Sequence, residues 1–233
     1  VPWVTWQSDP TMSDYEEGSS DRQLKIVVVG DTGIGKTNIC TRFVYDQFNR
    51  QHVKTSGADF YVKIAQGIGT DVTVKISDVG GQELTGKMME NYLYGAHALV
   101  FVYDITNYLS FENLEEWHSV VLSKTNDPIE HMALVGNKAD LEYMRAIKHE
   151  KHQKFSQQNH MSAHIVSAKT GEGVSLCFQK IIAEILGIRL TKRDQEQQQP
   201  MVVAEIIRCP NVSRVKEAVT SSKGAQSGVC SVQ

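Results

Sequence analysis

The chain has 233 residues, which is enough for one large domain with tails. Hydrophobic residues make up 41% of the sequence, so a sizeable core can form, and the formal net charge of -3 excludes a general polycationic attraction to nucleic acid. The longest apolar runs fall far short of the roughly 20 residues that span a bilayer, so any membrane attachment is expected to be peripheral.

The cysteines and histidines form no recognisable metal motif. The spacings of Cys40, Cys177, Cys209 and Cys230 match no zinc site, and Cys40 and Cys177 are expected to be buried, reduced thiols. Four histidines gather in the last third of the chain, and we expect them on a solvated face: His149, His152, His160 and His164.

The first half of the chain contains strand-like runs. Residues 1–23 show no period of either kind and are expected to form a disordered N-terminal extension. Leu24 to Val29 is a β-branched run typical of a strand covered on both faces. Between Ala58 and Ser77, Gly67-Ile68-Gly69 separates two further runs and predicts an antiparallel hairpin. Later buried strands are predicted at Ala98 to Tyr103, Ala133 to Val135 and His164 to Val166.

Helical patterns separate the other strands. Strands that alternate with helices predict an α/β domain with a doubly wound, mostly parallel sheet, which we place at residues 24–187. Residues 188–233 are expected to be a flexible tail. The clearest helical face is the last, with Val174, Phe178, Ile181, Ile182 and Ile185 at helical spacing.

A phosphate-loop pattern, G-x-x-x-x-G-K-[ST], directly follows the first strand and opens a helical pattern. Its backbone N–H groups can wrap the β-phosphate, and the dipole of the following helix adds to the attraction. We expect Lys36 to bridge the β- and γ-phosphates and the Thr37 hydroxyl to coordinate Mg²⁺. The nucleotide-binding residues predicted here are Gly30, Asp31, Thr32, Gly33, Ile34, Gly35, Lys36, Thr37 and Asn38.

A second motif, Asp78-Val-Gly-Gly-Gln82, lies at the end of the hairpin's second strand. The Asp78 carboxylate can hold Mg²⁺ through a water molecule. The N–H of Gly81 can then reach a γ-phosphate, and Gln82 can orient the attacking water.

Two more motifs follow strands: Asn137-Lys-Ala-Asp140 and Ser167-Ala-Lys169. Open α/β sheets bind ligands at such carboxyl ends. Asp140 can accept hydrogen bonds from guanine N1–H and N2–H, whereas adenine offers neither donor and would leave the carboxylate unpaired. Among the other residues of these motifs, Asn137 can brace the loops, Lys138 can lie on the base plane, and the Ala168 N–H can meet guanine O6.

In this order and spacing, the four motifs resemble those of the Ras superfamily of small GTPases over about residues 24–187. Thr55-Ser-Gly-Ala-Asp-Phe60 and Tyr103-Asp-Ile-Thr-Asn107 are similar to Rab sequences. The stretch Ser110-Phe-Glu-Asn-Leu114 and the terminal Cys-Ser-Val-Gln resemble the divergent Rab branch numbered twenty-eight. The resemblance implies a phosphate-loop G domain with a six-stranded sheet and one antiparallel edge hairpin. It also implies that Thr55 coordinates Mg²⁺ and Phe48 stacks on the guanine.

The same resemblance implies a GTP/GDP switch that hydrolyses GTP with Mg²⁺, with Gln82 and Lys36 as catalytic residues. GTP would order two loops, residues 48–60 and 78–92, which an exchange factor, a GTPase-activating protein and effectors would contact. A monomer without nucleic-acid partners is expected. The implied process is vesicle or protein trafficking, with an endosomal or ciliary-base membrane as its setting.

Two positions depart from the Rab pattern. Thr32 replaces a glycine of the phosphate loop, and its side chain is expected to crowd Gln82 and slow hydrolysis. The alternatives are that Thr32 is tolerated, or that the chain is a GTP-binding scaffold with negligible hydrolysis. Ser77 replaces a tryptophan that, with Phe60 and Tyr92, forms an exposed aromatic triad for effectors, so effector choice is expected to differ.

The third departure is at the terminus, where Cys230-Ser-Val-Gln233 resembles a C-a-a-X prenylation box that favours farnesyl. The imperfect match leaves an ordinary tail cysteine as the alternative. A prenyl transferase and a membrane are the partners implied through Cys230. One lipid chain binds reversibly, so exchange between the cytosol and the cytoplasmic side of a membrane is expected.

Overall fold

The computed structural model describes residues 22–51, 53–65, 71–125 and 128–190. These residues form one six-stranded sheet in the order β2-β3-β1-β4-β5-β6. Only the β2–β3 pair is antiparallel; every other neighbouring pair is parallel. The predicted fold class is confirmed. The strands are β1 (Arg22–Val29), β2 (Ala58–Ala65), β3 (Val72–Val79), β4 (Ala98–Asp104), β5 (His131–Asn137) and β6 (Ser162–Ile165).

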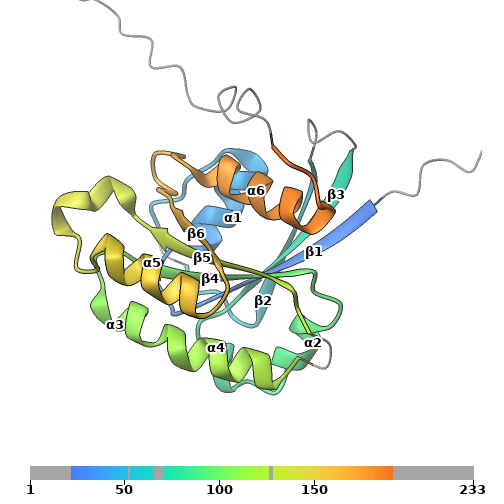
Figure 1. Ribbon diagram of the computed structural model, residues 1–233, viewed down its shortest axis with the longest axis horizontal. Coiled ribbons are helices and arrows are strands. Elements are labelled where there is room, and N and C mark those ends of the chain that lie inside the picture. The colour runs from blue at the N-terminus through green and yellow to red at the C-terminus, as the bar shows by residue number, and fades with distance from the viewer. Residues whose placement is uncertain (1–21, 52, 66–70, 126–127, 191–233) are drawn as a thin grey trace, which may run out of the picture. The chain divides into compact units, whose positions relative to one another are not determined.

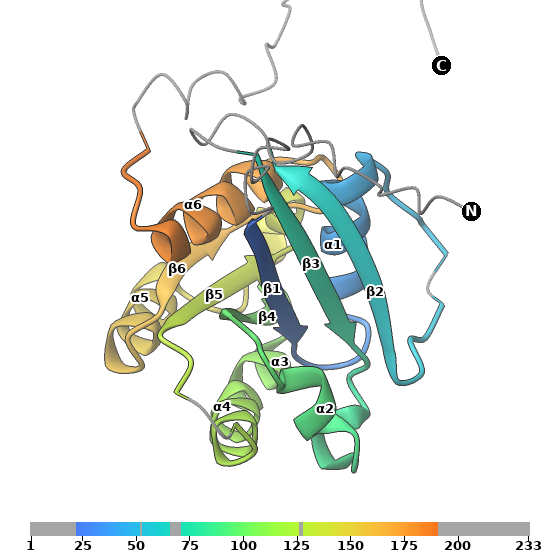
Figure 2. The ribbon, with the colours of Figure 1, turned by 90° about the vertical axis from the view of Figure 1, so that its right-hand side faces the viewer.

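Helices cover both faces of the sheet (Figures 1 and 2). On one face lie α1 (Lys36–Tyr45) and α6 (Val174–Leu186), and on the other lie α2 (Met89–Leu93), α3 (Tyr108–Glu112), α4 (Leu114–Ser123) and α5 (His149–Gln158). Two short 3₁₀ segments, η1 (Glu83–Thr85) and η2 (Ala139–Met144), follow β3 and β5.

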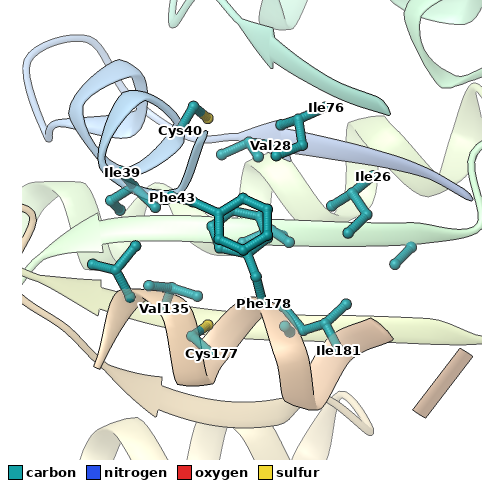
Figure 3. Close-up of a cluster of buried hydrophobic side chains, with 14 of the residues drawn as sticks. Ile26, Val28, Ile39, Cys40, Phe43, Ile76, Val135, Cys177, Phe178 and Ile181 are labelled. Atoms are coloured by element: carbon teal, nitrogen blue, oxygen red, sulfur yellow. The ribbon is translucent and has the colours of Figure 1, made fainter. Parts of the chain in front are cut away.

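Two hydrophobic cores result because successive strand residues point to opposite faces. In β1, Ile26 and Val28 join the core under α1 and α6, whereas Val27 and Val29 join the core on the other side. Figure 3 shows the first core, where the rings of Phe43 and Phe178 stack with their centroids 4.2 Å apart. Cys40 and Cys177 are buried there as free thiols, as predicted.

Several strands are longer than their apolar runs, because pairing with a neighbouring strand continues beyond the apolar residues. Arg22 pairs with Val72, so β1 begins two residues before the predicted boundary at Leu24. The last strand spans Ser162–Ile165 rather than residues 164–166, because Ser162 pairs with Ala133. The predicted turn at residues 67–69 and nearly all of both predicted tails lie outside the described residues.

His152 corrects the expectation of a solvated histidine face. It is only 4% exposed, and its Nδ1 lies 2.9 Å from the Tyr103 hydroxyl. The residue occupies the inner face of α5, and this burial lowers the pKa of His152 to about 4. The imidazole is therefore neutral in the folded protein near pH 7. His164 in β6 is half-buried and also departs from the expectation, while His149 and His160 are exposed.

Candidate nucleotide site

The carboxyl ends of the parallel strands bring the four sequence motifs to one edge of the sheet. The phosphate loop follows β1, Asp78 lies near the end of β3, and Asn137 ends β5. Ser167 follows β6. Two adjoining pockets open here and share Gly33, Gly35, Asn38 and Asn49 in their walls.

The phosphate loop is built around glycines with positive φ, including Gly33 (82°) and Gly35 (94°). Residues with a side chain rarely adopt this backbone conformation, so glycine is needed where the loop turns into the start of α1. Lys36 is buried beneath the loop, and its Nζ donates to the carbonyl oxygens of Gly30 and Asp31 at 2.8 Å each. Burial is the main cause that lowers the pKa of Lys36.

Three oxygen-bearing side chains meet beside the phosphate loop. The Thr37 hydroxyl donates to Asp78 Oδ2 at 2.5 Å and lies 3.1 Å from the Thr55 hydroxyl. The other oxygen of Asp78, Oδ1, is buried and has no hydrogen-bond partner among the residues that the structure describes. Burial raises the pKa of Asp78 to about 6, against the opposing effects of Thr37 and Lys36. Hard oxygen ligands around an unsatisfied carboxylate are a fit for Mg²⁺.

The lining of the second pocket includes the Asn137 loop and Phe48. Asn137 holds two loops together, because its Nδ2 donates to Ile34 O at 2.8 Å and its Oδ1 accepts from the Ala168 N–H at 3.1 Å. The Ala168 N–H was expected to donate to guanine O6, but in this structure it donates to Asn137. Other residues that line this pocket are Lys138, Asp140, Leu141 and Lys169.

Asp140 is oriented by its neighbours. The Ser167 hydroxyl donates to one carboxylate oxygen at 2.6 Å, and the Lys169 ammonium lies 3.3 Å from the other. Although partial burial acts to raise it, these contacts hold the pKa of Asp140 below its usual value. The carboxylate is therefore ionised and able to accept hydrogen bonds. Lys138 is fixed by Asp104, with Nζ and Oδ2 2.6 Å apart.

The predicted catalytic glutamine is placed differently from the other site residues. Gln82 is exposed at the start of η1 and does not line the phosphate pocket, whereas Gly81 does. Gly81 packs so closely on Thr32 that a β-carbon at Gly81 would overlap the Thr32 backbone and hydroxyl. Thr32 thus contacts the segment that carries Gln82.

The expected effector surface has an exposed Phe60, 68% accessible, with its ring centroid 6.5 Å from that of Tyr92. Ser77 lies opposite Phe60 in the β2–β3 pair and is only 2% exposed. The small side chain leaves the two aromatic rings without the third ring of the Rab pattern.

Sequence reasoning missed the side chains that brace these loops from a distance. The Asp31 carboxylate, predicted as part of the nucleotide site, turns toward α4 and accepts from Asn113 Nδ2 at 2.7 Å and Trp117 Nε1 at 2.8 Å. Arg42 donates to Ala168 O at 3.0 Å and Lys169 O at 2.9 Å, which ties α1 to the loop after β6. No local sequence signal marks these contacts.

We predict that Trp117→Phe accelerates GDP release by about tenfold, because Asp31 loses a charge-assisted hydrogen bond and the phosphate loop loosens. Release of a fluorescent GDP analogue measures the effect. Val121→Ala is the matched control, since Val121 is equally buried on α4. Equal acceleration in both variants would show that general loosening of α4, and not the bond to Asp31, is responsible.

The phosphate-loop motif and the residues expected to bind guanine and Mg²⁺ meet at one edge of the sheet, which is the arrangement of a G domain of the small-GTPase class. A model of the Ras family matches residues 25–187. The chain therefore belongs to the Ras family of small GTPases.

The sequence is also similar to "Ras-related protein Rab-28" of Caenorhabditis elegans. The two are 38% identical over 224 residues, which cover 94% of this chain and 90% of that protein. This makes the chain a Rab-like member of the family. Among the described residues, no helix combines the length and apolar character needed to cross a membrane.

Proposed function

We propose that this chain is a Rab-like molecular switch that binds GTP or GDP with Mg²⁺, hydrolyses GTP, and recruits effectors to membranes in vesicle or protein trafficking. The main support is the buried Oδ1 of Asp78, which has no hydrogen-bond partner among the described residues and belongs to the carboxylate that Thr37 contacts through its other oxygen. A buried carboxylate oxygen without a partner is costly unless a ligand or cation satisfies it.

The geometry supports a set of proposed binding roles. Backbone N–H groups of residues 32–37 would hold the α- and β-phosphates, and Lys36 would exchange its carbonyl contacts for phosphate oxygens. Thr37, Thr55 and Asp78 would hold Mg²⁺, and the bound ion would neutralise part of the negative charge of the phosphates.

Base selection would depend on Asp140. Its ionised carboxylate faces the second pocket and can pair with guanine N1–H and N2–H, with Phe48 and Lys138 against the base. Adenine would leave the carboxylate desolvated and unpaired, which argues against an ATPase or nucleotide kinase.

The switch would operate through two short contacts to the γ-phosphate, from Thr55 and from the N–H of Gly81. Both residues line the phosphate pocket. When hydrolysis removes the γ-phosphate, residues 48–60 and 78–92 would relax, and an exchange factor, a GTPase-activating protein and effectors would distinguish the two states.

Hydrolysis would need Gln82 to rotate from its exposed position to orient water in line with the γ-phosphate. No covalent nucleophile is required, so positioning and charge stabilisation set the rate. Because Thr32 contacts the neighbouring Gly81, we expect slow turnover. The same contact favours the second candidate, a GTP-binding scaffold with negligible hydrolysis.

Single-turnover hydrolysis by the GTP-loaded full chain separates the two candidates. For a cycling switch, Gln82→Leu should be slower than wild type and Thr32→Gly faster. If wild type and Gln82→Leu are equally inert while GTP stays bound, the scaffold is the better description. If Thr32→Gly leaves the rate unchanged, crowding by Thr32 is not the cause of slow turnover.

Membrane attachment is proposed through prenylation of Cys230, which lies outside the described residues. A single lipid chain gives weak, reversible binding, so the protein would exchange between cytosol and a membrane; an endosomal or ciliary-base membrane is proposed from the Rab resemblance alone. Cys230→Ser should move the cellular pool to the soluble fraction, with Cys209→Ser as the matched control. Identical fractionation of Cys230→Ser and wild type would refute the anchor.

A further inference from the structure

The edge strand β2 presents an apolar surface and a backbone edge without a neighbouring strand among the described residues. Within that part of the chain it is the terminal strand of the sheet, next to β3 (Figure 2). On its outer face Phe60, Val62 and Ile64 are 68%, 56% and 59% exposed. A long apolar edge strand is a template for pairing with another strand.

The hydrogen bonds between β2 and β3 show which residues of β2 direct their backbone N–H and C=O groups to the open edge. Gly80 N donates to Gly57 O at 2.8 Å, and these residues continue the antiparallel register by one pair beyond Ala58 and Val79. Because hydrogen-bonded pairs alternate along such a ladder, the odd-numbered residues of β2 bond to β3. The even-numbered residues therefore direct their N–H and C=O groups to the open edge: Ala58, Phe60, Val62 and Ile64.

We propose that β2 pairs antiparallel with β2 of a second copy of this chain, with Tyr61 on the two-fold axis. In this register, Phe60 of each copy lies opposite Val62 of the other, in hydrogen-bonded positions. On the opposite face, Asp59 of each copy lies opposite Lys63 of the other. The strand is thus self-complementary in backbone, apolar and charged groups.

The charges select this register. Shifting the pairing by two residues in either direction keeps the backbone bonds but places Tyr61 opposite Lys63 or Asp59, and the charge pairing is lost. Asp59 is exposed, and Lys63, although its ammonium contacts Phe43 O, retains further donors. Edge charges often only block aggregation; here they are of opposite sign and placed symmetrically about Tyr61.

The interface is small, so the dimer is expected to be weak in solution and to form mainly where the protein is concentrated, as on a membrane. This departs from the monomer that the sequence predicts. It does not depend on GTP hydrolysis and applies to the GTP-bound protein, because Asp59 and Phe60 belong to the segment 48–60 that is proposed to relax after hydrolysis.

A charge swap in the full chain, loaded with a non-hydrolysable GTP analogue, tests the pairing. Asp59→Lys and Lys63→Asp should each weaken self-association by about tenfold, because two attractions become two repulsions. A mixture of the two variants should restore wild-type association, measured by energy transfer between labelled chains. Weakening without restoration in the mixture, or no change in either variant, would overturn the proposal.

Disulfide trapping tests the register, with Cys209 and Cys230 changed to Ser. Tyr61→Cys places two thiols across the two-fold axis, at a Cα separation of about 4.5 Å, which a disulfide can bridge. Val62→Cys is more exposed, but its counterpart is a diagonal neighbour about 7–8 Å away. Tyr61→Cys should cross-link much faster; equal rates, or faster linkage of Val62→Cys, would refute this register.

Discussion

Replacing Asp140 with Asn is expected to weaken GTP binding by at least about 100-fold, because an amide donor would then face guanine N2–H, which is itself a donor. Xanthine carries a carbonyl oxygen at that position and offers an acceptor instead. The variant should therefore prefer xanthosine triphosphate. Competition between the two nucleotides on one protein sample measures the change in preference directly.

The matched control for this experiment is Glu142→Gln. Glu142 lies in the same 3₁₀ segment, but its carboxylate is bound by Arg145 with oxygen–nitrogen distances of 2.6 and 2.7 Å and does not line the pocket. Its loss should leave the preference for guanine intact. If Asp140→Asn loses both nucleotides equally, the carboxylate supports the loop and does not read the base.

Adding a β-carbon at Gly81 is expected to weaken the binding of GTP while leaving the binding of GDP nearly unchanged. In Gly81→Ala the added methyl group would overlap the backbone nitrogen of Thr32, which cannot yield easily because Asp31 is held by Asn113 and Trp117. The Gly81 segment must move away, and its N–H loses the γ-phosphate. We expect affinity for a non-hydrolysable GTP analogue to fall by about tenfold or more, with GDP affinity nearly unchanged.

Gly95→Ala serves as the control for backbone strain. Gly95 has a φ of 66°, but a β-carbon there would meet no atom within 4 Å. This variant should lose stability without changing the ratio of GTP-analogue to GDP affinity. A fall in that ratio for both variants would mean that strain in this region, and not the contact with Thr32, controls γ-phosphate binding.

The sequence was most informative where the chemistry is local. The residues around Lys36 and Thr37 are contiguous, so one motif predicts both the loop and its place between a strand and a helix. Asp140 and Ser167 were predictable as a pair because parallel strands end at the same edge. The structure places their side chains 2.6 Å apart, although no motif specifies that contact.

The long-range braces could not be predicted in this way. Asp31 and Trp117 are 86 residues apart, and Arg42 and Ala168 are 126 residues apart. Such pairs depend on the position of a helix over the sheet, which hydrophobic spacing alone does not specify. The ends of β1 and β6 were misplaced for a related reason: pairing with a neighbour, rather than apolar character, decides where a strand begins.

The two hydrogen bonds of Asn137 have a consequence for the kinetics of nucleotide release. One amide joins the loop that would hold the phosphates to the loop beside the base, so the two halves of the pocket are mechanically coupled. A partner that displaces either the phosphate loop or the loop beside the base would therefore disturb both loops. Dissociation should then be a single concerted step without a long-lived, half-released intermediate, and an exchange factor would need only one point of leverage.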